Sequence, residues 1–540
     1  MFLMPMVMPP LPPPQAQIKI LSGADVWGEN QKRPALLRGQ AVAIQGDRVL
    51  DLAPKSLLFK KYPKAEVIHL GGGTLLPGLI ESHGHVVGLG SSLEELQLNG
   101  IKDKAEVLKK IKEWSKKNKQ SWLIGRGWDQ NLWPEKSFPT AQDLDDLDIA
   151  NPIILERVDG HAVWVNSEAL SLASINKLTV DPLGGHITRD KEGNPTGILV
   201  DKATSLVQEI LPLPDDTSIA RRILLGLNYL KDLGFSSVCD MGVNKEELNI
   251  YRRLDEEKKL PIKVFAYLVN NDALIKHELI RPFTPLETRF KIQGVKIYMD
   301  GALGSRGARL FEPYSDDPLN RGLWITSLEN TDRVVKHVLN AGYQPAIHAI
   351  GDAANHEIIK ILSRYGPFKS SSLRPRIEHA QIVAPDDIRK MGAANIIASI
   401  QPVHCTSDHS WTPSRLGQNR LDEAFPWRNM LSHDVTLVLG SDTPVESPNP
   451  YITIAAAETR QDQYQQPPLG FLPSQVMTRT EAIDAYTRQA GRALGEPRMG
   501  IIKTGAYADL IWIPENILQV GFERLRQLKT SRIWISGQER

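Results

Sequence analysis

Eight short apolar runs in the middle of this 540-residue chain constrain its fold more than any other feature. Each run is long enough for one buried strand, and longer stretches with helical periodicity separate most of them. Strands that alternate with helices are typical of a parallel sheet, and eight parallel strands close a TIM (β/α)8 barrel. In chain order the runs are LLPGLIES, FSSVCDM, IKVFAYLV, QGVKIYMD, QPAIHAIG, RPRIEHA, IIASIQP and TLVLGSD. We therefore predict an α/β protein with such a barrel at 74–497.

The segments outside these runs predict the rest of the architecture. The gap after the first run is far longer than the others, and we interpret about 91–234 as an insertion after barrel strand 1. It has its own amphipathic helix in KAEVLKKIKEWSKK and its own strands in SWLIGRGWD and PIILERV. Residues 18–73 and 498–540 both carry short β-branched segments punctuated by Gly, Asp and Pro, so the two ends are expected to complete one composite β-sandwich. The Pro-rich residues 1–17 predict a disordered tail rather than a signal peptide.

Charge and cysteine content narrow the class of protein. The formal net charge of +1 gives no reason to expect binding to nucleic acid or to an anionic membrane. No apolar run is long enough to span a bilayer. The two cysteines, Cys239 and Cys405, form no CxxC pattern, so a disulfide framework is not expected. This composition predicts a cytoplasmic protein.

Metal-ligand residue types recur at the carboxyl ends of the predicted barrel strands. His83 and His85 stand one residue apart in LIESHGH, so in a strand both side chains point to one face. His348, His379 and Asp442 end the fifth, sixth and eighth runs. A single His or Asp at a strand end is more often a hydrogen-bonded structural residue than a metal ligand. Because barrel enzymes carry their chemistry at this end, the convergence of imidazoles and a carboxylate predicts a divalent metal site.

Lys296 lies in the fourth run and differs from the other candidates in its chemistry. A protonated ammonium group cannot ligate a cation. Carboxylation of the amine by CO2 would convert the side chain into an anion that can bridge two metal ions. The alternative is a lysine that binds substrate or forms an ion pair. The position in the barrel favours the carboxylated lysine.

Together these motifs resemble the amidohydrolase superfamily. The likeness is carried by PGLIESHGH, the lysine of the fourth run, AIHAIGD, RIEHAQ and GSDTPV. Further motifs, among them GRGWDQNLW, VDGHAVWVNSEAL and VKIYMDGALGSRGARL, resemble amidohydrolase family 3, the group with N-substituted formamide deformylase-like and YtcJ-like proteins. The resemblance covers nearly the whole chain from about Ile18.

The resemblance implies a barrel with a composite β-sandwich and one or two divalent ions, usually zinc. By position, the implied ligands of the more buried ion are His83, His85 and Asp442, and those of the second ion are His348, His379 and a carboxylated Lys296. Three residues depart from the family pattern. Glu81 is a conservative replacement before the HxH motif, whereas His186 and Cys239 are expected near the substrate and leave its identity open.

The predicted reaction is hydrolysis of a C–N bond other than a standard peptide bond. A metal ion lowers the pKa of a bound water from about 15.7 to about 7, and Asp442 is the candidate base that accepts the proton and passes it to the leaving nitrogen. Hydrolysis of an ester, lactone or phosphotriester by the same site is one alternative. A barrel that has lost catalysis and only binds metal is another.

Seven further residues are candidates for the substrate side: Trp128, Asp129, His161, Trp164, Asp300, Arg306 and His404. His161 and His404 would donate hydrogen bonds to a developing oxyanion, although structural roles explain them equally well. The tryptophans suit either a pocket wall or the core of the insertion. Asp300 and Arg306 either line the pocket or pair with each other. We expect a small-molecule substrate and no nucleic-acid or membrane partner, and we leave a homo-oligomer open.

Overall fold

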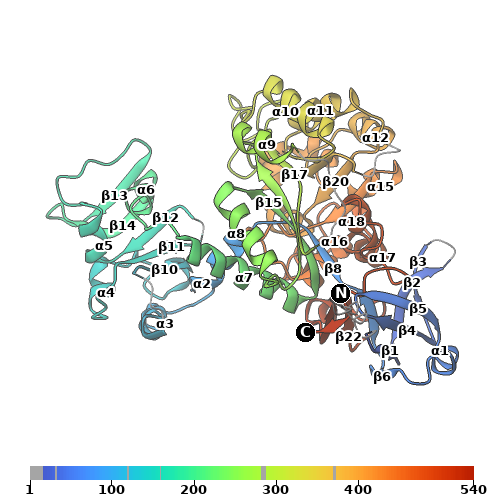
Figure 1. Ribbon diagram of the computed structural model, residues 1–540. Helices are drawn as coiled ribbons and strands as arrows, with labels where there is room; N and C mark the ends of the chain where they lie inside the picture. Colours follow the sequence, from blue (N-terminus) through green and yellow to red (C-terminus); the bar gives the residue numbers. More distant parts are fainter. Residues whose placement is uncertain (1–15, 31–32, 118–120, 159, 281–287, 369–372) are drawn as a thin grey trace, which may run out of the picture. The chain divides into compact units, whose positions relative to one another are not determined.

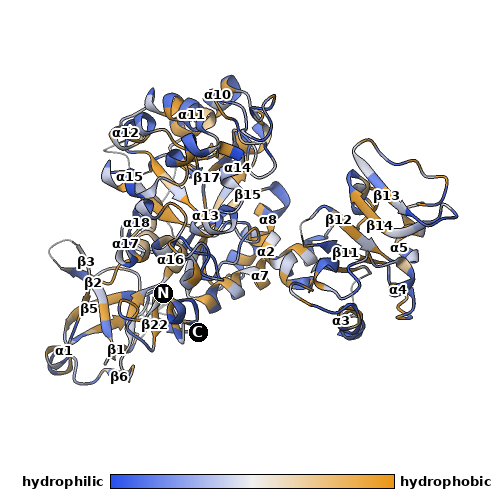
Figure 2. Cartoon of the chain, turned by 180° about the vertical axis from the view of Figure 1, so that it is seen from behind, coloured by the Kyte–Doolittle hydropathy of each residue, from blue (hydrophilic) through white to orange (hydrophobic). Residues whose placement is uncertain are grey.

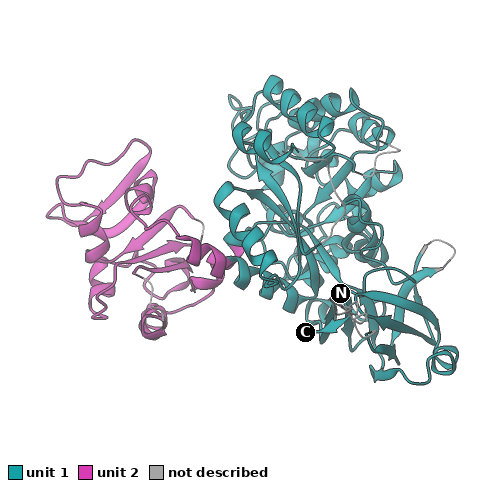
Figure 3. Ribbon diagram, viewed as in Figure 1, with its two compact units in different colours: residues 1–88, 223–540 teal, residues 89–222 magenta. Residues whose placement is uncertain are grey.

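The computed structural model describes residues 16–30, 33–117, 121–158, 160–280, 288–368 and 373–540. Most of the tail expected at 1–17 therefore lies outside the described residues. The chain divides into two compact units (Figure 3). Unit 1 comprises residues 1–88 and 223–540, and unit 2 comprises residues 89–222. No helix among the described residues is both long and apolar enough to cross a bilayer.

The eight apolar runs form one parallel sheet in unit 1, which confirms the predicted barrel (Figure 1). The strands follow one another around the sheet in chain order. The first and last strands meet at their carboxyl ends, where His85 N–H donates to Thr443 O and Asp442 N–H donates to His83 O, each at 2.8 Å. The barrel strands are β8 (Leu79–Gly84), β15 (Phe235–Val243), β16 (Lys263–Val269), β17 (Phe290–Tyr298), β18 (Gln344–Ala349), β19 (Arg376–His379), β20 (Ile397–Ile400) and β21 (Thr436–Leu439).

Helices follow most of the barrel strands, and several of them are amphipathic. In α10 (Leu328–Asn340), Val334, Val335 and Val338 recur at helical spacing and are buried, and the Ser327 side chain caps the first turn. Figure 2 shows hydrophilic and hydrophobic residues side by side on these helices. The others are α8 (Lys245–Glu256), α9 (Asp272–Glu278), α11 (Asp352–Ser363), α12 (Pro385–Ala394), α13 (Pro402–Asp408), α15 (Trp427–Ser432), α16 (Pro450–Thr459), α17 (Arg479–Tyr486) and α18 (Arg488–Ala493).

Both ends of the chain build a pair of small sheets in unit 1. One sheet has the order β5-β4-β1-β6, and the other has the order β24-β23-β22-β7-β2-β3, so N-terminal and C-terminal strands pair within the second. Leu21, Val42, Leu75, Leu510 and Trp534 share one buried cluster between them. The strands are β1 (Ile18–Ser22), β2 (Asp25–Asn30), β3 (Arg33–Leu37), β4 (Gln40–Gln45), β5 (Arg48–Pro54), β6 (Glu66–His69), β7 (Thr74–Pro77), β22 (Leu510–Ile513), β23 (Arg532–Ile535) and β24 (Gln538–Glu539).

Unit 2 is a six-stranded sheet with its own apolar core, and it falls largely within the predicted insertion. The sheet order is β13-β14-β12-β11-β10-β9. Two helices, α2 (Val86–Glu94) and α7 (Asp216–Leu233), carry the chain between the units. The other strands and α-helices are β9 (Leu96–Gln97), α3 (Lys104–Lys117), β10 (Leu123–Trp128), α4 (Ala141–Asp145), β11 (Ile153–Arg157), β12 (Ala162–Val165), α5 (Ser167–Leu172), β13 (Gly185–Arg189), β14 (Pro195–Asp201) and α6 (Ser205–Gln208).

Candidate metal centre

His83 and His85 lie at the carboxyl end of the first barrel strand, and each ring forms a hydrogen bond through its Nδ1. His83 Nδ1 donates to Glu378 Oε2 at 2.6 Å, and His85 Nδ1 donates to the Met241 carbonyl at 2.7 Å. The opposite nitrogens converge, because His83 Nε2 lies 3.3 Å and His85 Nε2 lies 3.1 Å from Asp442 Oδ1. A hydrogen bond at Nδ1 leaves the Nε2 lone pair for an ion, which is the usual arrangement of metal-binding histidines.

Asp442 lies three residues beyond β21 and is 8 % exposed. Its φ of +59° is uncommon for a non-glycine residue, and it aims the carboxylate at the two histidines. Burial would raise the pKa of this carboxyl, but His83 and His85 outweigh burial and hold the pKa well below its usual range. The side chain is therefore an anion at neutral pH.

Asp442 also belongs to a second group of ligand types. Ligand atoms of His379, His404 and Asp442 all lie within 4.8 Å of one another, as do those of His83, His85 and Asp442. The rings of His379 and His404 stack with centroids 5.9 Å apart and an interplanar angle of 9°. His404 follows the seventh apolar run, and the sequence predicts it on the substrate side. The structure instead places it with His379 and Asp442, whose side chains can bind a metal ion.

His348 lies beside this second group but outside it. Its ring centroid is 4.5 Å from that of His379, and its Nε2 lies 3.6 Å from Asp300 Oδ1. Burial lowers the pKa of His348 to about 3 and the pKa of His379 well below its usual value. Both rings are therefore neutral imidazoles at neutral pH.

The donor set fits a divalent ion. Three buried ring nitrogens, His348 Nε2, His379 Nδ1 and His404 Nε2, have no hydrogen-bond partner among the described residues. Buried polar atoms without hydrogen-bond partners are costly, and a cluster of them beside an anionic carboxylate suits a cation as their common partner. Neutral imidazoles and a carboxylate are the ligand types of zinc and similar ions.

Lys296 lies against the same histidine. Its Nζ is 3.1 Å from His83 Nε2, and the residue is 1 % exposed. Burial lowers the pKa of Lys296 to about 8. A larger share of the side chain is thus the neutral amine than in an ordinary lysine, and the neutral amine is the form that reacts with CO2.

Two glutamates that support the site were missed as site residues in the sequence. Glu81 accepts hydrogen bonds from the backbone N–H groups of His83 (3.0 Å) and Ser441 (2.9 Å), which ties β8 to the residues after β21. Burial raises the pKa of Glu81 to about 8. Glu378, which holds His83, pairs in turn with Arg376 at 2.5 Å. Strand alternation in RIEH places Arg376 and Glu378 on one face, and that spacing was the available signal.

Comparison with known proteins identifies the family. A family model described as the amidohydrolase family matches residues 66–540. This chain belongs to the amidohydrolase family. The resemblance of its motifs to this family is thereby confirmed.

Individual relatives cover nearly the whole chain. YtcJ of Bacillus subtilis (strain 168) is 31% identical over 515 residues, which span 93% of this chain and 96% of that protein. The N-substituted formamide deformylase of Arthrobacter pascens is 24% identical over 514 residues, with 92% and 94% of the two chains covered. The crystal structure of a metal-dependent hydrolase from Pyrococcus furiosus has a TM-score of 0.77 and 27% identity, covering 93% of this chain and 100% of that one. The chain is a metal-dependent hydrolase of the amidohydrolase family.

Several residues expected near the substrate of this amidohydrolase have structural contacts in unit 2. Trp128 and Trp164 are fully buried in one apolar cluster. This burial corresponds to the alternative in which both tryptophans form the core of the insertion. Asp129 Oδ1 accepts from the Asn131 N–H at 3.0 Å, and His161 pairs with an aspartate of β14 at 2.9 Å while largely exposed. His186 likewise forms an exposed hydrogen bond at 2.8 Å with an aspartate five residues earlier.

Asp300 and Arg306, in unit 1, do not form the pair that was one of the expectations. Asp300 is buried and accepts from the backbone N–H groups of Arg309 (2.9 Å), Ile350 (3.0 Å) and Gly351 (2.8 Å). Arg306 pairs with Asp316 through two bonds of 3.1 Å. Asp300 therefore joins the loops after β17 and β18.

Cys239 lies in the barrel core rather than at a surface. It is fully buried, its Sγ is 3.8 Å from Arg376 Nη1, and burial raises the pKa of the thiol to about 12. The side chain is thus a protonated thiol packed among core residues, which makes a direct contact with substrate at this position unexpected.

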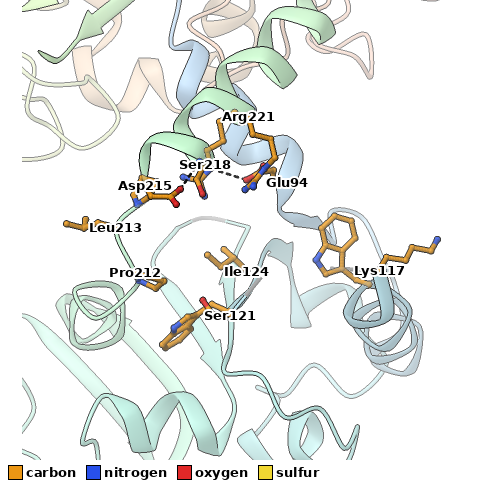
Figure 4. Close-up of a pocket in the computed structure, with 13 residues that line it drawn as sticks. Glu94, Lys117, Ser121, Ile124, Pro212, Leu213, Asp215, Ser218 and Arg221 are labelled. Atoms are coloured by element: carbon orange, nitrogen blue, oxygen red, sulfur yellow. Dashed lines mark hydrogen bonds and ion pairs between the residues drawn. The ribbon is translucent and has the colours of Figure 1, made fainter. Parts of the chain in front are cut away.

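Unit 2 contains a cavity of about 710 Å³ (Figure 4). Glu94 accepts from Arg221 at 2.5 Å and from Arg222 at 3.0 Å on its wall, and Trp114 and Trp122 add aromatic surface. All its described lining residues belong to unit 2, and none of them is a histidine. The cavity is therefore not part of the metal centre.

Proposed function

We propose that this amidohydrolase uses divalent zinc to cleave an amide or formamide-like C–N bond outside standard peptide bonds. The observation that carries the proposal is the meeting of two groups of ligand types at Asp442, at the carboxyl ends of the barrel strands. Imidazole and carboxylate ligands support zinc. Similarity over nearly the whole chain to an N-substituted formamide deformylase supports the class of bond.

His83, His85 and Asp442 would hold one ion, and His379 and His404 would lie around a second. When bound, the ion lowers the pKa of a water molecule from about 15.7 to about 7. Lys296 would complete the site as a carboxylated side chain, which its burial and its lowered pKa support. In that form its single negative charge would offset part of the positive charge of the ions.

Asp442 would move the proton. Its carboxylate is anionic at neutral pH because the neighbouring histidines hold its pKa low. Oδ1 faces the Nε2 atoms of His83 and His85, whereas Oδ2 lies 3.9 Å from His404 Nε2. An oxygen of this carboxylate would accept the proton of the attacking water and deliver it to the leaving nitrogen, as a general base and then a general acid.

The test begins with the metal content of the purified protein. Chain stripped with a chelator and reloaded with zinc would be assayed on N-formyl, N-acyl and cyclic amides, and on esters, lactones and phosphotriesters. Turnover of at least one amide class, lost in Asp442→Asn, supports the proposal. Turnover of oxygen esters alone would overturn the C–N assignment. Absence of a stoichiometric divalent ion in active protein would overturn the metal assignment.

A further inference from the structure

A buried ion pair lies next to His83 in the barrel interior. Arg376 and Glu378 are both on β19 and point to one face. Arg376 Nε donates to Glu378 Oε1 at 2.5 Å, Arg376 Nη2 donates to Oε2 at 3.1 Å, and the same Oε2 accepts from His83 Nδ1 at 2.6 Å. Arg376 is 1 % exposed and Glu378 is fully buried. The pair therefore forms a continuous chain of charge-assisted hydrogen bonds that ends at a candidate ligand.

The guanidinium group is itself held from three other strands. Arg376 Nη2 donates to the Ser82 carbonyl at 2.6 Å and to Ser399 Oγ at 2.7 Å, and Nη1 lies 3.4 Å from Tyr267 Oη. These contacts come from β8, β20 and β16. Because Arg376 cannot move away, it keeps the Glu378 carboxylate in one orientation toward His83.

Stability alone gives no reason for this arrangement. Removing two charges from water offsets much of their mutual attraction, and replacing a buried pair by apolar residues of similar size is often neutral or stabilising. Glu378 Oε2 also accepts a hydrogen bond from His83, so the buried pair is better explained by its effect on that histidine. A carboxylate acceptor fixes the ring orientation and raises the basicity of the opposite nitrogen.

The two histidines of the HxH motif differ in this respect. His85 Nδ1 donates to a neutral carbonyl, that of Met241, whereas His83 Nδ1 donates to a charged carboxylate. The other side of the His83 ring faces Asp442 Oδ1 at 3.3 Å and Lys296 Nζ at 3.1 Å. The ligand side of His83 is therefore its Nε2.

We propose that Arg376 and Glu378 are positioning residues of the metal centre, which keep the proton of His83 on Nδ1 and aim the lone pair of Nε2 at the ion. Neither residue contacts the ion or the substrate in this proposal. Arg376 orients Glu378, and Glu378 orients His83. The inference rests on the proposed metal dependence of the enzyme.

The first test is the metal affinity of Glu378→Gln, measured with zinc and a competing chromophoric chelator on metal-free protein. We expect an affinity about 10–100-fold below that of the wild type, the usual effect of removing such a partner. The ligand-field spectrum of the cobalt-loaded protein should shift, because it reports the geometry around the ion. Glu378→Asp, which keeps the charge, should bind more tightly than Glu378→Gln.

A double variant and a matched control separate positioning from folding. Arg376→Met with Glu378→Gln removes both charges, so no unpaired charge stays buried if the single variant fails to fold. The control is Lys291→Met with Glu496→Gln, which removes another buried ion pair of unit 1, with Nζ and Oε1 3.1 Å apart. Lys291 is at the amino end of β17, away from the strand ends that carry the ligand types. The control should keep the zinc affinity and cobalt spectrum of the wild type.

The outcomes distinguish this inference from the proposed function. If wild type binds zinc but the folded double variant binds it equally well with an unchanged cobalt spectrum, the inference is wrong and the proposed function stands. If the control loses as much affinity as the double variant, the effect is a general loss of core stability, and the inference is again wrong. If wild type binds no divalent ion, the proposed function fails and the inference fails with it.

Discussion

His85 Nε2 lies 3.1 Å from Asp442 Oδ1, although 357 residues separate the two in the chain. The contact exists because β8 and β21 meet where the barrel closes, so the candidate site requires the complete barrel. Ions that bind this site bind only the folded protein. Metal binding and barrel stability must therefore be coupled.

Metal removal should lower the thermal stability of the protein. At a free ion concentration about 100 times the dissociation constant, binding adds about 2.7 kcal/mol to the free energy of unfolding. Thermal unfolding of the protein as purified, after chelation and after reloading with zinc would measure it. His83→Asn with His85→Asn should show a smaller zinc-dependent shift than the wild type, because only the group around His379 and His404 would still bind an ion. A shift as large as that of the wild type would place the first ion elsewhere.

Asp442→Asn should lower kcat by about 10²–10⁴-fold, the range expected for loss of a general base. Circular dichroism and metal content would be compared with those of the wild type, so that loss of activity can be separated from loss of fold or ion. Asp386→Asn, at an exposed carboxylate of α12, is the control and should retain wild-type kcat. A kcat for Asp442→Asn within about threefold of wild type would contradict the role.

Lys296 should be carboxylated in the active enzyme. Its pKa of about 8 leaves more neutral amine at pH 7 than an ordinary lysine has, so the reaction with CO2 is favoured. Preparation in CO2-free buffer should reduce activity, and bicarbonate should restore it. Protein incubated with ¹³C-bicarbonate should show a carbamate carbon that is absent from Lys296→Met. Full activity without CO2 and no such resonance would leave Lys296 an ordinary buried lysine.

Asp408 should make the stability of the protein depend on pH. Burial raises the pKa of this carboxyl from 3.8 to about 7, with the charge of Glu446 as a further cause. Well below pH 3.8, Asp408 is protonated in both the folded and the unfolded chain, so it does not change the free energy of unfolding with pH there. As pH rises toward 7 the unfolded chain ionises first, and this group's contribution to the free energy of unfolding falls.

Asp408→Asn should remove that dependence. At pH 8 the variant should be more stable than wild type by up to about 4 kcal/mol, and at pH 4 the two should be similar. Urea unfolding at both pH values would measure the difference, with the exposed Asp386→Asn as a control that should show none. An equal difference at the two pH values would show that Asp408 does not titrate in this range.

Trp164→Ala should destabilise the protein rather than alter substrate affinity alone. The ring is fully buried with Trp128 in the core of unit 2, and truncation of a buried aromatic costs about 3–5 kcal/mol. Urea unfolding and steady-state kinetics would be measured together. Trp164→Phe should restore most of the stability. A raised KM with unchanged stability would instead support the pocket-wall alternative.

Particular residues show which features of the fold and of the site can be predicted from local sequence patterns. All eight barrel strands were predicted, because a buried strand is a short apolar run and the count of runs limits the fold. Candidate metal ligands could also be recognised in the sequence, because His83, His85, His379 and Asp442 stand at the ends of predicted strands. The roles of Trp128 and Trp164 stayed open because a buried and an exposed tryptophan have the same sequence signal.

By itself, the sequence determined the strand count, the residue types at the strand ends and the family, all of which depend on local order along the chain. Only the tertiary structure decided which side chains meet. It grouped His404 with His379 and Asp442, left His348 beside them, and placed Glu378 against His83. The reason is physical. Barrel closure brings distant strands together, and positive φ angles at His379 (+71°) and Asp442 (+59°) redirect side chains in a way that strand alternation does not predict.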